Sequence, residues 1–484
     1  MNLKKTAIAG AKWTTIGVVG RSIFQLLQVS ILTRFLPKEA FGLVAMALFL
    51  VQFSNIFVDM GMASAILHRQ EATKKEYSSI YWLNIFISFF LYVILYFLAP
   101  FASNFYNEPE LLNLVPILGV NLMLIALGRQ HRVIMQKDFQ FAAIAKVELI
   151  AYFIGLITAI LLAINDFGLY SLVYSTLMAS LISNLLFLII NLRLNPVLLH
   201  FKLKETRPFL KIGGYTMGSS LLDFSAREID VLIIGKMLGA ENLGLYTLAK
   251  QIVLKLYAII NPVIINVLNP LLASIQKDKQ RIKKIYLKIV YLLSSLNFPV
   301  YLLVAVLSRE ILIIVYGYEY AEASLVLSFL ALSYVTTSIN NPVGSLQIAT
   351  GRTDMGFKWT IIRLLITPIV ILFAAKFNIN MVAISLAVLS IILIFPLWFI
   401  QLKPMINVTL KEYIFQFSKP FVIILSIFGI FIVLFQNSFK STYLIITISI
   451  KTSVALGLYF LLLLVLDKKR IKESLALIFN LKNQ

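Results

Sequence analysis

The chain has 484 residues, of which 60% are apolar and only 13% are charged. Soluble domains carry about 25% charged residues, so this composition excludes a water-soluble enzyme and a disordered chain and indicates a polytopic helical membrane protein. There are no cysteines, which excludes disulfides, thiolate catalysis and cysteine-ligated metals. The formal net charge of +21 fits basic loops that set membrane topology better than nucleic-acid binding.

Apolar runs recur along the whole chain, and a spanning helix needs roughly 20 apolar residues. Fourteen transmembrane helices are predicted at Trp13–Leu36, Phe41–Leu67, Ile80–Phe101, Leu111–Leu127, Leu149–Ile164, Leu169–Leu192, Ile212–Leu238, Leu243–Leu268, Ile285–Leu307, Ala323–Ile339, Trp359–Ala375, Ile379–Leu402, Phe417–Phe435 and Tyr443–Leu466. This all-α chain divides into five parts: an N-terminal lobe of helices 1–6 (1–194), a cytoplasmic linker (195–211), a C-terminal lobe of helices 7–12 (212–402), helices 13 and 14 (403–466) and a cytoplasmic tail (467–484).

The distribution of Lys and Arg supports this count and predicts the orientation. With the N-terminus in the cytoplasm, 32 of the 43 basic residues lie in the even loops, in both termini or in the first cytoplasmic turns of the adjoining helices. The odd, external loops hold five: Lys38, Lys236, Arg309, Lys376 and Lys440. Such a split follows the positive-inside rule, so both termini are predicted to be cytoplasmic.

An internal repeat occurs at an offset of 202 residues. The stretch ILTRFLPKEAFGLVAMA from Ile31 aligns with IIGKMLGAENLGLYTLA from Ile233, so that Gly42 pairs with Gly244. Each copy links the first and second helices of a six-helix block. Because six is even, the two blocks have the same orientation, which predicts a parallel repeat with the substrate site between the halves, as in many transporters.

Charges within the predicted helices are the candidate functional residues, since each costs at least ~2.5 kcal/mol at membrane depth unless it is paired or hydrated. The embedded cations suit an anionic substrate group such as phosphate. Candidate substrate-binding residues are Arg21, Arg227, Lys250 and Lys255. Candidate charge-coupling residues are Asp223, Glu228 and Asp230.

Two interpretations of these charges remain open. Spacings of four and three place Asp223, Arg227 and Asp230 on one face of helix 7, where they could form a purely structural ion-pair ladder with the lysines of helix 8. Alternatively, they line a hydrated cavity in which a carboxylate takes up a proton, and Glu228 is the first candidate. In helix 1, Arg21 is expected to be neutralised by Asp59.

No motif for catalysis is present. The chain lacks a Walker loop, G-x-G-x-x-G, H-E-x-x-H and a plausible nucleophile–base pair. We therefore expect no enzymatic activity, no cofactor and no metal. Any transport must be driven by an ion gradient, by the substrate gradient or by a partner.

Several segments resemble one known family. They are IGKMLGAENLGLYTLAKQIV from Ile234, KWTTIGVVGR from Lys12, LTRFLPKEAFG from Leu32, VDMGMASAILHRQ from Val58 and LQIATGRTDMGFK from Leu346. They are similar to Wzx-like polysaccharide flippases of the multidrug/oligosaccharidyl-lipid/polysaccharide (MOP) exporter superfamily, in the branch containing colanic acid and teichuronic acid exporters. The resemblance covers nearly the whole chain.

This resemblance implies a MOP/MATE-like fold with two lobes around a central cavity that work by alternating access. It implies a flippase that moves undecaprenyl-diphosphate-linked oligosaccharides to the outer leaflet of the bacterial inner membrane for surface polysaccharide such as lipopolysaccharide or O-antigen. A polysaccharide polymerase and glycosyltransferases are possible partners. The cationic residue of helix 1 in related lipid II flippases resembles Arg21. The alternatives are a cation-coupled multidrug exporter, a lipid II flippase and a non-transporting scaffold of a glycan-assembly complex.

Overall fold

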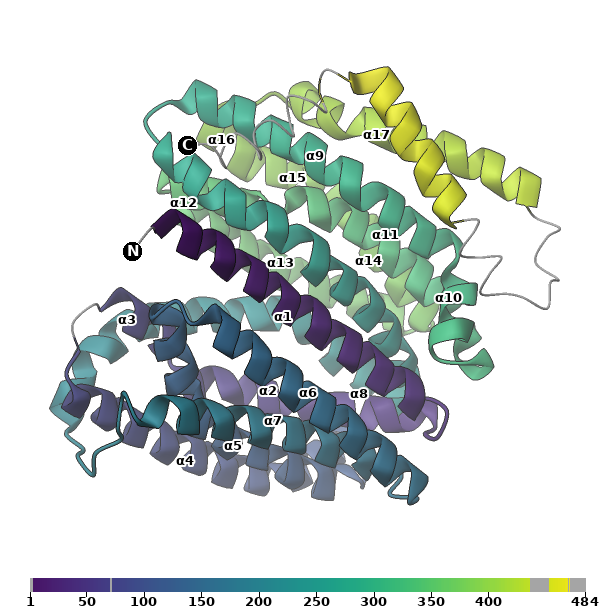
Figure 1. Ribbon diagram of the computed structural model, residues 1–484. Coiled ribbons are helices and arrows are strands. Elements are labelled where there is room, and N and C mark those ends of the chain that lie inside the picture. The colour runs from purple at the N-terminus through teal and green to yellow at the C-terminus, as the bar shows by residue number, and fades with distance from the viewer. Residues whose placement is uncertain (1–2, 70–71, 436–451, 469, 471–484) are drawn as a thin grey trace. The chain divides into compact units, whose positions relative to one another are not determined.

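The computed structural model describes residues 3–69, 72–435, 452–468 and 470 (Figure 1). Helices make up almost all of these residues, and no strand occurs among them. The helices before the middle of the chain are α1 (Leu3–Leu32), α2 (Lys38–Asp59), α3 (Met62–His68), α4 (Lys74–Tyr106), α5 (Leu111–Lys137), α6 (Phe141–Ile164), α7 (Tyr170–Leu192) and α8 (Leu203–Ser274). The later ones are α9 (Lys279–Val306), α10 (Ser308–Val315), η1 (Tyr318–Ala323), α11 (Ser324–Asn340), α12 (Val343–Thr350), α13 (Thr353–Ala375), α14 (Ile379–Ile392), α15 (Ile394–Leu397), η2 (Trp398–Leu402), α16 (Lys403–Ile406) and α17 (Leu410–Phe435).

Eleven helical stretches among the described residues are long and apolar enough to cross a membrane. One of these stretches, Leu203–Pro262, holds the predicted helix 7 and most of helix 8. The predicted helix 13 corresponds to α17. The start of the predicted helix 14 falls within 436–451, which lies outside the described residues. Almost all of the predicted tail also lies outside the described residues. The chain is therefore a multi-pass membrane protein, as its composition predicts.

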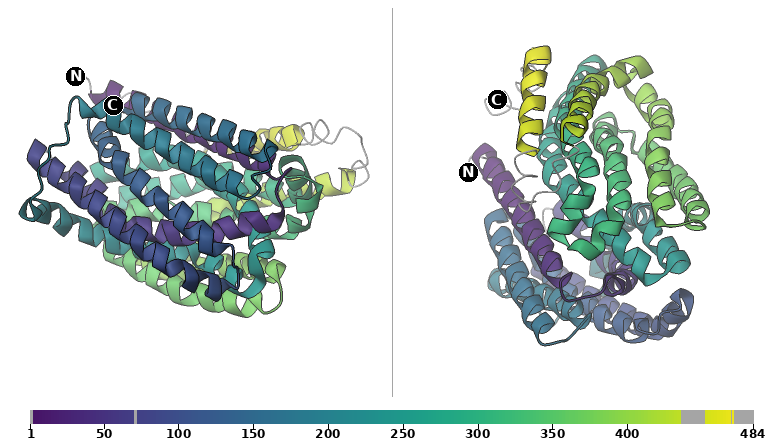
Figure 2. Two further views of the ribbon diagram at one scale, coloured as in Figure 1. Left: turned by 90° about the horizontal axis from the view of Figure 1, so that it is seen from below. Right: turned by 90° about the vertical axis from the view of Figure 1, so that its right-hand side faces the viewer.

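The chain forms two compact units, Met1–Thr247 and Leu248–Gln484. In the first unit, α6 packs between α1 and α7, and α5 packs against α2, α4 and α7. In the second, α9 packs between α11 and α17, while α14 lies against α11 and α13. The long helices within each unit run roughly parallel (Figure 2), as expected for a helical bundle that spans a membrane.

The long element α8 contains one sharp break. Gly239 has φ 78° and ψ 179°, a conformation that side chains disfavour, and it separates two helical segments. This glycine lies in the second copy of the sequence repeat. The break therefore forms the turn of the hairpin that was predicted between helices 7 and 8.

The two repeated hairpins contact each other through their paired glycines, at a place that we call the hairpin seam (Lys38, Gly42, Ala240 and Gly244). A Cβ atom on Gly42 would overlap the carbonyl oxygen of Ala240, and one on Gly244 would overlap the carbonyl oxygen of Lys38. Ala240 is the counterpart of Lys38 at the repeat offset of 202. The contact is thus reciprocal, which is independent geometric support for the parallel repeat.

A second close contact joins α8 to the break between α2 and α3, and we call it the break seam (Met60, Gly61, Gly213 and Thr216). Met60 and Gly61 both have positive φ, 42° and 65°, and end α2. A Cβ on Gly213 would overlap the carbonyl oxygen of Met60, and one on Gly61 would overlap Thr216 Oγ1. Between the two seams, the ring of Phe224 lies 5.5 Å from that of Phe49. The first half of α8 therefore lies along α2 over most of its length.

The predicted linker, 195–211, includes the first turns of α8 and is attached to the start of α4. The Leu198 backbone N–H donates to Ser78 Oγ at 2.9 Å, and the Leu198 carbonyl accepts from Trp82 Nε1 at 2.9 Å. Ser79 Oγ donates to Glu205 at 2.7 Å, and Phe209 is buried in a core cluster with residues of α3, α4 and α5. The linker is therefore an ordered part of the first unit.

Candidate functional site

Five charged residues of the first unit gather in one place, which we call the charge cluster (Arg21, Asp59, Arg129, Arg132 and Glu148). They come from α1, α2, α5 and α6, and three cations face two anions, so the cluster carries a net charge of +1. Membrane-embedded charges persist only where they are paired or hydrated. The cluster is therefore a candidate site for an anionic ligand.

Glu148 of α6 joins two arginines of the cluster. Its Oε1 accepts from Arg132 Nε at 3.0 Å and from Arg132 Nη2 at 2.8 Å, while its Oε2 lies 3.4 Å from Arg21 Nη1. The carboxylate is 12% exposed, whereas the side chains of Arg21 and Arg132 are 32% and 39% exposed. The Arg21 guanidinium also lies 5.9 Å from the centre of the Tyr152 ring, within the range of a cation–π contact.

Asp59 pairs with a different arginine from the one expected. Its Oδ1 lies 2.9 Å from Arg129 Nε, and Arg129 Nη1 donates to Asn55 Oδ1 at 3.0 Å. The prediction that Asp59 neutralises Arg21 was therefore wrong, because Arg129 lies closer to the end of α2 and satisfies this carboxylate first. Asp59 directly precedes Met60, so this ion pair lies next to the break seam.

The sequence prediction placed Arg129, Arg132 and Glu148 outside the spanning helices because it ended each helix at the nearest charged residue. The helix predicted to end at Leu127 continues to Lys137, and the one predicted to begin at Leu149 begins at Phe141. At 1.5 Å per residue, Glu148 lies about 10 Å and Arg132 about 8 Å from the nearer helix end. The available signal was Glu148 itself, the one acidic residue in the apolar sequence of α6.

The four predicted residues of the first half of α8 are not all alike. Arg227 Nε donates to the backbone carbonyl of Asp223 at 3.3 Å, and both side chains are exposed. Glu228 is half-buried. Asp230 is buried and accepts from Tyr246 Oη across the hairpin at 2.6 Å and from the Val231 backbone N–H at 2.8 Å. Asp230 therefore has a structural contact between the two arms of the hairpin.

The two predicted lysines of the second half of α8 belong to the second unit. Lys250 is buried, with 8% of its surface exposed, and Lys255 is half-buried. They are five residues apart on one helix, and 3.6 residues per turn places them about 140° apart around its axis, on different faces. The structure thus gathers Arg21 with Arg132 and Glu148, while the predicted residues of α8 lie in their own hairpin.

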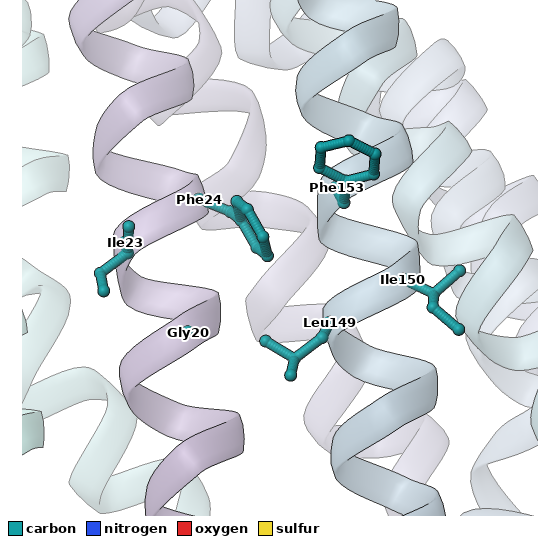
Figure 3. Close-up of a pocket in the computed structure, with 6 residues that line it drawn as sticks. All are labelled: Gly20, Ile23, Phe24, Leu149, Ile150 and Phe153. Atoms are coloured by element: carbon teal, nitrogen blue, oxygen red, sulfur yellow. The ribbon is translucent and has the colours of Figure 1, made fainter.

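An apolar groove lies along the contact between α1 and α6 (Figure 3). Its volume is about 350 Å³, and Gly20, Ile23, Phe24, Leu149, Ile150 and Phe153 line it. Gly20 makes room for Leu149, since a Cβ there would overlap that side chain. On a helix of 3.6 residues per turn, Arg21 and Ile23 flank this contact on opposite sides. The groove can accept hydrocarbon, and the contact separates it from the charge cluster.

The fold is shared with solved membrane transporters. The lipid II flippase MurJ in an inward closed conformation superposes with a TM-score of 0.76 at 15% identity, covering 96% of this chain and 99% of MurJ. A multidrug resistance MATE family transporter of the MOP superfamily, inward-facing, gives 0.56 at 14% identity, covering 82% and 94%. This chain is therefore an all-α membrane protein with the MOP-superfamily transporter fold.

Sequence comparison narrows this class to one family. Residues 31–325 match the polysaccharide biosynthesis protein family, and this match spans more than half of the chain. The lipopolysaccharide biosynthesis protein WzxC of Escherichia coli is 27% identical over 422 residues, covering 87% of this chain and 86% of WzxC. The teichuronic acid biosynthesis protein TuaB of Bacillus subtilis is 29% identical, covering 87% of each chain. The chain belongs to the polysaccharide biosynthesis protein family.

Proposed function

We propose that this protein is a flippase for undecaprenyl-diphosphate-linked oligosaccharide repeat units. It moves them from the inner to the outer leaflet of the bacterial cytoplasmic membrane for the synthesis of a surface polysaccharide. The observation that carries this proposal is the charge cluster, which has a net positive charge within the membrane-spanning helices of a transporter fold. The biosynthetic relatives WzxC and TuaB support the assignment of a glycan-lipid substrate.

The substrate class follows from the chemistry of arginine. A guanidinium binds phosphate oxygens through two parallel N–H donors, and this interaction is strongest where water is scarce. Arg21 and Arg132 are about one-third exposed, so a ligand can reach both. A cationic drug would instead require an excess of carboxylates. The cluster therefore favours the diphosphate of a lipid-linked glycan over a multidrug substrate.

The proposed orientation places both termini in the cytoplasm, the charge cluster in the inner half of the membrane and the hairpin seam at the outer surface. The substrate reaches the cluster from the inner leaflet while the hairpin seam is closed. Release to the outer leaflet requires the hairpins to separate, which is the expected motion of alternating access between the predicted lobes, 1–194 and 212–402. The glycine contacts of the seam make its closed form tight.

The other predicted site residues belong to the same proposal. Arg227, Lys250 and Lys255 contribute positive charge along the substrate path, and Asp223, Glu228 and Asp230 set the charge state of that path. The exposed arginine and the half-buried Glu228 suit contact with a hydrated substrate. A polymerase and glycosyltransferases would use or supply the same glycan lipid as partners.

The test is the leaflet distribution of lipid-linked oligosaccharide in cells that lack this protein. We expect the glycan lipid to accumulate on the cytoplasmic face and to return to the outer face on re-expression. An Arg21→Ala protein should restore outward display at least about tenfold less well, because it loses a charge-assisted contact to phosphate. Membrane levels of the two proteins are compared in parallel, and Arg352→Ala, which removes an exposed arginine paired with Asp354, is the matched control.

Two results would contradict the proposal. Normal outward display in the deletion strain would reject flipping by this chain and would favour a scaffold role. Equal rescue by the Arg21→Ala and wild-type proteins would remove Arg21 from the substrate site.

A further inference from the structure

Glu148 holds two arginines that are more exposed than the carboxylate itself. Each of its oxygens serves one arginine, Oε1 for Arg132 and Oε2 for Arg21. A guanidinium has five N–H donors. Within the described part of the chain, Arg132 places two N–H groups and Arg21 one on this carboxylate, so seven of their ten donors remain for another acceptor.

The carboxylate resembles the ligand that these arginines would bind. Arginine recognises carboxylate and phosphate through the same planar fork of donors, with similar N···O distances. The pair that Glu148 bridges carries a charge of +1 with Glu148 and would carry +2 without it. The neighbouring Arg129 is already paired with Asp59, so it adds little to this balance.

We infer that Glu148 is an internal counter-ion, which a diphosphate displaces from Arg21 and Arg132 and which takes the two arginines back when the diphosphate leaves. This inference rests on the proposed function, because it assigns a role in the transport of an anionic lipid. Glu148 is a positioning residue: it holds the two guanidinium groups next to each other and pre-oriented in the empty site. It also competes with the ligand for them.

Competition between Glu148 and the diphosphate would help the transporter to release its substrate. Two arginines at membrane depth attract a diphosphate strongly, since charges interact more strongly there than in water. A transporter that binds its ligand tightly and releases it slowly turns over slowly. A carboxylate that is already present offers the arginines an alternative partner at release, and so lowers the affinity while raising the rate of turnover.

The test measures the affinity of the purified full-length protein, in lipid nanodiscs, for farnesyl diphosphate and for inorganic diphosphate. We expect Glu148→Gln to bind both probes about tenfold more tightly than the wild type and yet to export less glycan lipid in cells. Arg132→Gln should bind both about tenfold more weakly. The conservative Glu148→Asp should lie close to the wild type in affinity and export, because it keeps the negative charge.

A charge-matched control separates competition from a general change in net charge. Asp354→Asn also removes one negative charge that is paired with an arginine, Arg352 at 2.9 Å, but it lies outside the charge cluster. It should leave both affinities within about twofold of the wild type. If Glu148→Gln does not fold, the comparison of Arg132→Gln with the double variant Arg132→Gln/Glu148→Gln gives the same answer, because the double variant should bind both probes more tightly.

A purely structural role for Glu148 predicts the opposite sign. Unchanged or weaker binding by Glu148→Gln, or by the double variant against its single parent, would overturn the counter-ion role. So would a gain confined to farnesyl diphosphate, because Glu148 competes with the phosphates and not with the hydrocarbon. The proposed function fails separately: normal display of glycan lipid in the deletion strain would reject flipping even if the binding of both diphosphates responds to Glu148→Gln.

Discussion

The two seams that join α8 to α2 and its neighbours are built in different ways. At the hairpin seam, Gly42 and Gly244 occupy equivalent positions of the repeat. Gly42 contacts Ala240 and Gly244 contacts Lys38, and these two partners are also equivalent positions of the repeat. At the break seam, Gly213 meets Met60, where α2 ends in two residues of positive φ. The contact at this second place involves unlike elements of the chain.

This difference indicates where the two halves of the repeat have kept their shape and where they have diverged. The hairpin seam needs only one glycine in each copy of the repeated hairpin, so both copies keep the same close backbone contact. The break seam lies next to the Asp59–Arg129 ion pair of the charge cluster. We therefore expect changes at the hairpin seam to act on the closure of that seam alone. Changes at the break seam should leave the hairpin seam closed and act on the break seam and on the ligand.

The largest effect is expected at the hairpin seam. Gly42→Ala places a methyl group against the carbonyl of Ala240, and the overpacking of about 1–3 kcal/mol favours separated hairpins by up to about a hundredfold. Surface polysaccharide should fall at least tenfold. The chain has no cysteine, so Ala40→Cys, a buried position beside the seam, can report opening through its reaction with a membrane-impermeant maleimide.

Because the contact is reciprocal, substitutions of its two glycines should have equal effects. Gly244→Ala should give the same loss of surface polysaccharide and the same rise in labelling as Gly42→Ala. Gly218→Ala adds the same methyl group to a position with open space around it and is the control. A difference of more than about tenfold between the two seam variants would contradict the reciprocal contact.

A smaller effect is expected at the break seam. Gly213→Ala places a methyl group against the carbonyl of Met60, but the turn between α2 and α3 can shift more readily than two packed helices. Surface polysaccharide should fall about threefold to tenfold while Ala40→Cys stays unreactive. Because Asp59 precedes this turn, the affinity for farnesyl diphosphate should change as well. Labelling of Ala40→Cys in this variant would show that the two seams are not independent.

The smallest effect is expected from the ion pair beside the hairpin seam. Lys38 Nζ lies 3.9 Å from Glu241 Oε1, and the glutamate side chain is 65% exposed. Exposed pairs contribute about 0–1 kcal/mol and are screened by salt. Glu241→Gln should therefore change surface polysaccharide by less than about twofold. A loss as large as that of Gly42→Ala would mean that charge, and not backbone contact, holds the hairpins together.

Much of the fold could be predicted because the apolar runs and the repeat are local features of the sequence. The pairing of Gly42 with Gly244 followed from the alignment alone, and the structure places both at one contact. The charge cluster could be predicted only in part. Arg21 and Glu148 are 127 residues apart, and hydropathy does not indicate which distant charge meets which.

The end of a helix was the other source of error. A charged residue marks the edge of an apolar run, but an α-helix continues through it as long as its backbone hydrogen bonds are satisfied. Arg132 and Glu148 lie in such extensions of α5 and α6. Both residues were therefore assigned to a loop, although their side chains meet within two helices that are long enough to span a membrane.

The attachment at the start of α8 determines how this helix can move. Leu198 before α8 and Glu205 and Phe209 in its first turns attach this part of the chain to the start of α4 and its neighbours, so it has little freedom to move. A displacement of α8 cannot be absorbed there as it would be by a loose tether. We expect the first half of α8 to rotate as a rigid rod about its attached end instead. Gly239 lies some thirty residues, or about 45 Å, along the helix from Phe209, so a small rotation at Phe209 gives a large displacement at Gly239.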